Sequence, residues 1–191
     1  MRFLVHPPNR LSAEAAEKAY VCGYDFTPWP CRSRIADEEL VIDRASNDSG
    51  TVNVPWSIDG QPQLMLSTGT LIERERPYNL AVELARGKIN QVRNQLAEWQ
   101  SIGLTVPQAL LDTLHEALEH FSRAVTQQDK VEVSSELADQ ALSLALDASR
   151  QLIACYTKQA LAARHRQATK LSTWLDSNLR HWLLDENTAR R

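Results

Sequence analysis

Residues 77–103 read PYNLAVELARGKINQVRNQLAEWQSIG, and this stretch decides the fold. Its apolar residues recur at intervals of four and three, the spacing that places side chains on one side of a helix. About 26 helical residues form a rod of roughly 39 Å, and its apolar stripe needs a partner. Gly87 interrupts the pattern, so we expect backbone or a neighbour to approach closely there. The stripe comprises Ala85, Ile89, Val92, Leu96 and Trp99.

Two further helical patterns follow. One opens at Thr105 with Gln108 three residues on, a capping-box spacing, and the other runs from Asp129 to about His165. Short connections make consecutive helices antiparallel, so the sequence predicts a three-helix unit. The stripe of the first pattern is Leu111, Leu114, Leu118, Phe121 and Val125. That of the second is Leu137, Ala141, Leu144, Ala148, Leu152 and Cys155.

The chain before Tyr78 has a different character. It holds seven of the eight prolines and four of the six glycines, and turn-forming residues at short intervals are typical of antiparallel strands. Ser12 is a candidate cap for a short helix over residues 12–19. A hairpin is expected around Asp37. The expected strands cover residues 20–24, 32–36, 39–44, 51–56 and 63–72, the last with Leu64, Leu66, Thr68, Thr70 and Ile72 on one face.

The sequence therefore predicts an α+β fold in three parts. Residues 1–76 form a small antiparallel β module, a sheet or half-sandwich, with a short N-terminal helix. Residues 77–168 form three long antiparallel helices, and the apolar side of the sheet packs on them. Residues 169–191 form a tail.

Composition excludes several classes of protein. The net charge is −3 and charged residues make up 24% of the chain, with no basic footprint for nucleic acid or for an anionic membrane surface. The apolar run near the N-terminus is too short for a signal peptide, and no window approaches the ~20 apolar residues of a membrane span. A cytoplasmic location is the default expectation.

The three cysteines, an odd number, do not form a disulfide framework. Cys22 and Cys31 flank the turn-rich segment 23–30 and would lie opposite each other if their flanks formed a hairpin. A disulfide there requires an oxidising compartment, and we favour two reduced side chains packed in a core. Cys155 lies on an apolar helix face and is also expected in the core.

Three segments carry a resemblance to a known family: GYDFTPWPCR at 23–32, STGTLIERERPYNLAVELARGKINQVRNQLAEWQ at 67–100, and ARHRQATKLSTWLDSNL at 163–179. Together they resemble the amino-terminal region of large planctomycete-type bacterial proteins classed with glycoside hydrolase family 10, which are xylanase-like. In that family a region of this size precedes a (β/α)8 barrel. The resemblance implies that LSTWL is the first barrel strand and that Asp185 begins the first barrel helix.

The resemblance transfers no catalytic residue. Retaining glycosidases use two carboxylates about 5–5.5 Å apart, and in the resembling family these glutamates lie on later barrel strands. The chain is thus expected to be a non-catalytic accessory module that binds carbohydrate or positions the barrel, with polysaccharide and the barrel as partners and without cofactor or metal. The alternative is a helical module for protein–protein contact or self-association.

The candidate carbohydrate site combines three aromatic residues with three polar ones. Aromatic faces pack against the C–H faces of sugar rings, and polar groups at the rim bind the hydroxyls. The alternative is that both tryptophans seal the sheet against the helices, which we favour because tryptophan is highly buried on average. The candidate platform is Tyr24, Trp29 and Trp56, and the candidate rim is Asp25, Arg32 and Asn53.

A second polar group follows one side of the helix in 77–103. An arginine–carboxylate link to Glu73, Glu75 or Glu83 would fix the helix against its neighbours, and we favour such an internal network over a ligand site. His115 and His120 are five residues apart, a poor spacing for two metal ligands on one helix face. The group comprises Glu83, Arg86, Asn90, Arg93 and Asn94.

Overall fold

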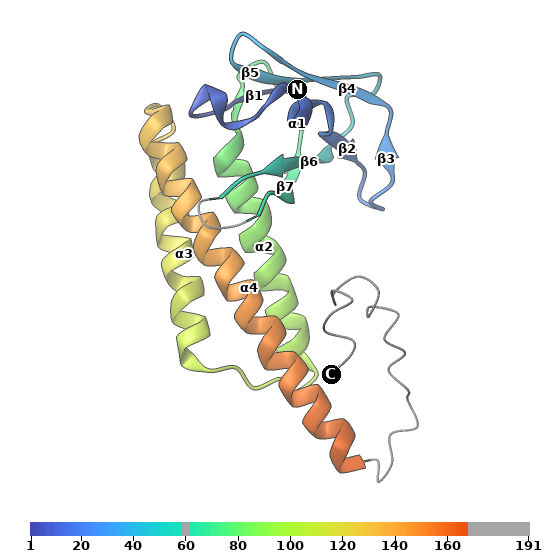
Figure 1. The fold of residues 1–191 in the computed structure, drawn as a ribbon, viewed down its shortest axis with the longest axis vertical. Helices are drawn as coiled ribbons and strands as arrows, with labels where there is room; N and C mark the ends of the chain where they lie inside the picture. The colour runs from blue at the N-terminus through green and yellow to red at the C-terminus, as the bar shows by residue number, and fades with distance from the viewer. Residues whose placement is uncertain (59–61, 168–191) are drawn as a thin grey trace, which may run out of the picture. The chain divides into compact units, whose positions relative to one another are not determined.

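The computed structural model describes residues 1–58 and 62–167 and has an α+β fold (Figure 1). Two compact units divide the chain, Met1–Tyr156 and Thr157–Arg191. The change from strands to helices near residue 76 falls inside the first unit. The expected barrel-like tail, residues 169–191, lies outside the described residues.

The strands of the described part form two four-stranded sheets, where the sequence predicted one. All neighbours are antiparallel except β1 and β8, which are parallel. The first sheet has the order β4 (Cys31–Ala36), β5 (Glu39–Arg44), β1 (Arg2–Leu4), β8 (Tyr78–Asn79). The second has the order β3 (Pro28–Trp29), β2 (Tyr20–Cys22), β6 (Gly50–Trp56), β7 (Leu64–Leu71).

The sequence did not predict β1 and β8, which are three and two residues long. They pair Phe3 with Tyr78, whose rings stack with centroids 5.7 Å apart. The predicted hairpin of β4 and β5 is confirmed. Its turn residues Asp37 and Glu38 have φ angles of 51° and 64°, as a two-residue hairpin turn matching the strand twist requires.

The sequence predicts that Leu64, Leu66, Thr68, Thr70 and Ile72 share one face of a strand, and this prediction is wrong for Thr70 and Ile72. The β6–β7 pairing shifts register between Thr51 and Asn53, which is a β-bulge. The bulge reverses the alternation of β7, so Leu71 is buried while Thr70 and Ile72 are exposed. No spacing rule applied to β7 alone could locate a bulge that depends on its partner.

The helices begin and end close to their predicted positions. Ser12 caps α1 (Ala13–Glu17), accepting a hydrogen bond from the Ala15 amide at 3.1 Å. Asn79 caps α2, accepting from the Val82 amide at 3.4 Å. The capping box at Thr105 is wrong, because α3 begins three residues later. A 3-10 turn spans Pro8–Arg10, and the long helices are α2 (Leu80–Ser101), α3 (Gln108–Thr126) and α4 (Val131–Gln167).

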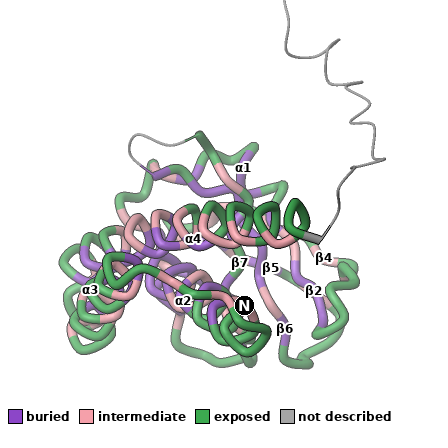
Figure 2. Tube along the Cα trace, turned by 90° about the horizontal axis from the view of Figure 1, so that it is seen from below, coloured by how far each residue is buried: buried purple, intermediate pink, exposed green. Residues whose placement is uncertain are grey.

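Within Met1–Tyr156, α2 lies beside α3 and α4 and turns its buried face toward them (Figure 2). The first half of α2, including Ala85 and Ile89, shares a core with both sheets. The second half contributes to a separate helical cluster. That cluster comprises Val92, Leu96, Leu110, Leu114, Ala148 and Leu152.

The close approach expected at Gly87 is confirmed, because α2 crosses β7 there. A Cβ atom added to Gly87 would lie 2.6 Å from the Thr68 carbonyl carbon and closer still to the Ser67 carbonyl oxygen. Glycine therefore serves as the contact surface between helix and strand, which explains its place in the middle of a long helix.

The cysteines in the described residues are all free. Cys22 lies opposite Pro28 in the second sheet, and Cys31 lies opposite Arg44 in the first, so the two do not face each other as a hairpin would require. Cys155 is only half-buried, and its Sγ lies 3.2 Å from the Thr105 carbonyl oxygen. Across the described ranges, every helix is too short or too polar to cross a membrane.

Candidate functional site

The structure separates the six residues of the candidate carbohydrate site. Trp56 is 1% exposed, with the Arg10 guanidinium 4.7 Å above its ring, and Asn53 is 6% exposed. The Asn53 amide donates to Cys22 Sγ and accepts from Ser67 Oγ at 2.6 Å. These two side chains lie inside the molecule, out of reach of a ligand.

Trp29 is half-buried and lies over two glycines. A Cβ atom added to Gly23 or Gly50 would come within 3.0 Å of the Trp29 ring. The Arg44 guanidinium makes a cation–π contact with Trp29, 5.7 Å from the centre of the ring. These contacts are all within the β module, and the predicted sealing of the sheet against the helices by Trp29 stays a prediction. Arg32 is exposed on β4.

Tyr24 and Asp25 lie in the exposed loop between β2 and β3. Asp25 folds back on Thr27, accepting from its amide at 3.1 Å and from its hydroxyl at 2.9 Å, and the backbone hydrogen bond lowers the pKa of the Asp25 carboxyl. Phe26 adopts a φ of 60°, which is uncommon for a non-glycine residue. This tight turn leaves Tyr24 98% and Phe26 80% exposed. Phe26 is not among the candidate residues that the sequence predicts.

Phe26 stands at one side of an open groove of about 720 Å³ between β7 and α2. Residues of β7 and of α2 from Gly87 to Glu98 line this groove, which we call the β7–α2 groove. Its β7 wall contributes Met65, Ser67 and Thr70. Its α2 wall carries four neutral amides and two charged residues: Asn90, Gln91, Asn94, Gln95, Lys88 and Glu98.

The main chain of β7 adds polar groups to this groove. β7 is an edge strand, and Met65 lies opposite Pro55, which has no amide hydrogen to donate. Met65 is therefore in a non-hydrogen-bonded pair, and its own N–H and C=O point away from β6 toward the free edge. The same alternation places the main chain of Ser67 on that edge.

The five polar residues predicted along α2 do not act together: two form a network, two line the groove, and Arg93 is exposed outside it. Arg86 donates from Nε to Glu83 at 2.7 Å and from Nη2 to the Thr70 carbonyl at 3.3 Å, and its guanidinium covers Gly69 at the bulge. Glu83 and Arg86 form the internal network. Asn90 and Asn94 instead line the β7–α2 groove.

Lys88 is a half-buried cation in the groove wall. Its Nζ donates to Gln91 Oε1 at 3.0 Å and to Ser149 Oγ of α4 at 3.1 Å. Both acceptors are neutral, and burial lowers the pKa of Lys88 below its ordinary value of 10.5. The charged form is thus less well solvated than in water.

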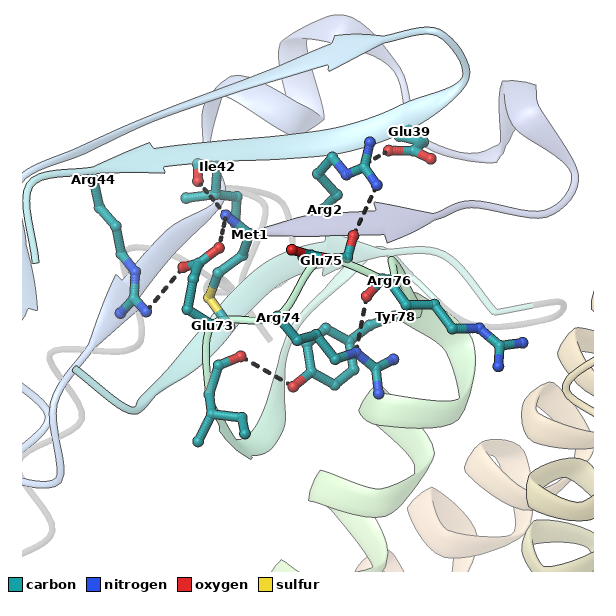
Figure 3. Close-up of polar contacts among 11 residues, drawn as sticks. Met1, Arg2, Glu39, Ile42, Arg44, Glu73, Arg74, Glu75, Arg76 and Tyr78 are labelled. Atoms are coloured by element: carbon teal, nitrogen blue, oxygen red, sulfur yellow. Dashed lines mark hydrogen bonds and ion pairs between the residues drawn. The ribbon is translucent and has the colours of Figure 1, made fainter. Parts of the chain in front are cut away.

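A second polar region fastens the segment 73–78 to the first sheet, and we call it the 73–78 clamp (Figure 3). The Met1 ammonium donates to the Ile42 carbonyl at 2.8 Å and lies 3.1 Å from Glu73, which also pairs with Arg44 at 3.3 Å. The Arg74 guanidinium lies 3.4 Å from the centre of the Tyr78 ring.

Burial raises the pKa of Glu73, yet the hydrogen bonds and positive charges of the Met1 ammonium and Arg44 outweigh it, so the pKa lies below 4.5. The Arg44 side chain is 3% exposed, and its Nε and Nη1 have no hydrogen-bond partner. Glu73 is thus the carboxylate that compensates Arg44. The clamp has a structural role.

Large apolar side chains are exposed at several places on the described helices and their ends, and self-association through the helices stays a prediction. They are Ile102, Val125, Val133, Ile153 and Leu161. In the described ranges, no group of three His, Cys, Asp or Glu residues gathers in a way that could hold a metal ion.

Comparisons with known proteins identify no relative. No protein-family description, curated protein or solved structure matches the chain significantly.

Proposed function

We propose that this chain is a non-catalytic carbohydrate-binding module, the accessory region of a glycoside-hydrolase-family-10-like protein, and that the β7–α2 groove holds the glycan. The observation that carries the proposal is the lining of the groove. Amides that donate and accept, the hydroxyls of Ser67 and Thr70, and the exposed ring of Phe26 match the mixture of hydroxyls and C–H faces on a sugar.

The acidic groups of the groove favour binding over hydrolysis. Among its described lining residues, Glu98 is the only carboxylate. Glycoside hydrolysis in its common forms requires two carboxyl groups flanking the bond. A single carboxylate at one end of an amide-lined groove suits recognition.

Isothermal titration calorimetry with xylan, cello-oligosaccharides and a panel of other polysaccharides tests the proposal. Asn94→Ala removes a groove amide and should weaken binding about fivefold, as expected for one hydrogen bond. Gln100→Ala is the matched control, since Gln100 is an exposed amide of α2 outside the groove. Absence of heat with every glycan would contradict the function.

The loop residues distinguish two positions for the site. Phe26 lines the groove, whereas its neighbour Tyr24 does not. Phe26→Ala should therefore weaken binding several-fold and Tyr24→Ala should leave it unchanged. The reverse result would move the site from the groove to the exposed face of the β2–β3 loop.

A further inference from the structure

Lys88 differs from the other half-buried lysine and arginine residues of the described chain. There are three others, and each has a carboxylate partner: Arg10 with Asp139, Arg44 with Glu73, and Arg86 with Glu83. The buried Met1 ammonium likewise pairs with Glu73. Lys88 has only the neutral acceptors Gln91 and Ser149. Because a charge partly withdrawn from water is more favourable with a counter-charge beside it, Lys88 is a candidate partner for an anion.

Lys88 lines the β7–α2 groove and is its only cation among the described lining residues. An ammonium in a partly desolvated wall attracts a carboxylate more strongly than an exposed one does, because water competes less. The Gln91 amide accepts from Lys88 Nζ through Oε1, so its Nε2 can donate to a carboxylate oxygen that Nζ leaves unbound.

We propose that the β7–α2 groove selects a glycan that carries a uronic acid residue, whose carboxylate pairs with Lys88. This inference rests on the proposed carbohydrate-binding function and names the ligand class within it.

Glu98 limits the number of carboxylates in the ligand. It lies ten residues beyond Lys88 on α2, about 15 Å along the helix axis, and lines the same groove. A second carboxylate at the Glu98 end would be repelled. The groove therefore fits a mostly neutral glycan with an isolated uronate better than a polyuronate.

The test compares one oligosaccharide carrying a single glucuronic acid residue with the same compound after its carboxylate is reduced to a primary alcohol. Calorimetry should give about tenfold tighter binding for the acidic form, the effect of one charge-assisted hydrogen bond. Lys88→Met should abolish this ratio, and Lys88→Arg should retain most of it. Lys130→Met, which alters an exposed lysine outside the groove, should leave the ratio unchanged.

The outcomes separate the two proposals. Equal binding of both forms by the unaltered protein, or a ratio that persists in Lys88→Met, overturns the uronate inference and leaves the carbohydrate function standing. Binding of neither form, nor of any other glycan, overturns the function and the inference with it. A melting curve of each variant confirms that it is folded before titration.

Discussion

The 73–78 clamp and the β7–α2 groove are both polar regions at the junction of sheet and helix, and they treat charge in opposite ways. In the clamp, Glu73 stands between the Met1 ammonium and Arg44, so each charge has a counter-charge inside the protein. In the groove, Lys88 has neutral acceptors only. The charges of the clamp are thus balanced within the fold, whereas our proposal assigns the counter-charge of Lys88 to a ligand.

The difference offers a way to tell a stabilising polar cluster from the proposed binding site. Both regions include residues of the segment 67–100, which carries the family resemblance. Charge balance separates them, because a charge that has its counter-charge within the fold does not need one outside. Substitutions in both regions test this difference in charge balance, and the largest effect is expected at the crossing of α2 and β7.

Gly87→Ala should give the largest effect, a loss of about 3 kcal/mol in the free energy of unfolding. The new Cβ would collide with the Ser67 and Thr68 backbone and push α2 from β7. Helix propensity alone predicts a gain of about 1 kcal/mol. Urea unfolding shows whether the free energy of unfolding falls or rises in Gly87→Ala. Ala97→Gly, at an exposed position of α2, is the control and should lose about 1 kcal/mol; stabilisation by Gly87→Ala would mean that the crossing is loose.

Glu73→Gln should destabilise the protein by about 2 kcal/mol, less than the 3–5 kcal/mol of a fully buried pair because Glu73 is partly exposed. The change leaves the buried Arg44 guanidinium and the Met1 ammonium without a counter-charge. Glu75→Gln is the matched control, since its side chain is exposed and only its carbonyl is used, accepting from Arg2 at 2.8 Å. Equal melting temperatures of the two variants would show that the Glu73 carboxylate does not stabilise the fold.

Acid should weaken the clamp specifically. The pKa of Glu73 is lower in the folded protein than its ordinary value of 4.5. As the pH falls, Glu73 is therefore protonated in the unfolded chain before it is protonated in the folded protein. The stabilisation is therefore present above pH 4.5 and is lost as pH falls through the folded pKa. Unfolding measured between pH 7 and pH 3 should show a smaller acid dependence in Glu73→Gln than in the unaltered protein, and parallel curves would contradict this assignment.

Much of the fold follows from spacing within single segments. The α2 stripe, the Ser12 cap, the turn at Asp37 and the close approach at Gly87 each depend on a few adjacent residues, and all four are confirmed. The strands β1 and β8 and the β6–β7 bulge depend on partners far away in the sequence, and local patterns do not contain them.

The site was less accessible to such reasoning. Aromatic residues near one another in sequence suggested a platform, but β6 directs Trp56 inward and Asn53 into a buried hydrogen bond. Asn90 and Asn94 are predicted from the sequence as polar residues near the stripe, and both lie in one wall of the groove. Lys88 could not be recognised, because the absence of a carboxylate beside it is a property of three-dimensional packing.

Lys88→Met should give the smallest effect and the opposite sign from Glu73→Gln, a gain of up to about 1 kcal/mol in the free energy of unfolding. Methionine keeps the length of the side chain and removes a charge whose burial is uncompensated. Because the pKa of Lys88 is lowered in the folded state, the unaltered protein should also gain stability relative to the variant as pH rises toward 10.5. Urea unfolding of both proteins at pH 7 and pH 10 measures the difference. A loss of stability in Lys88→Met would show that the bonds to Gln91 and Ser149 satisfy this lysine, and the groove would then need no anion to complete it.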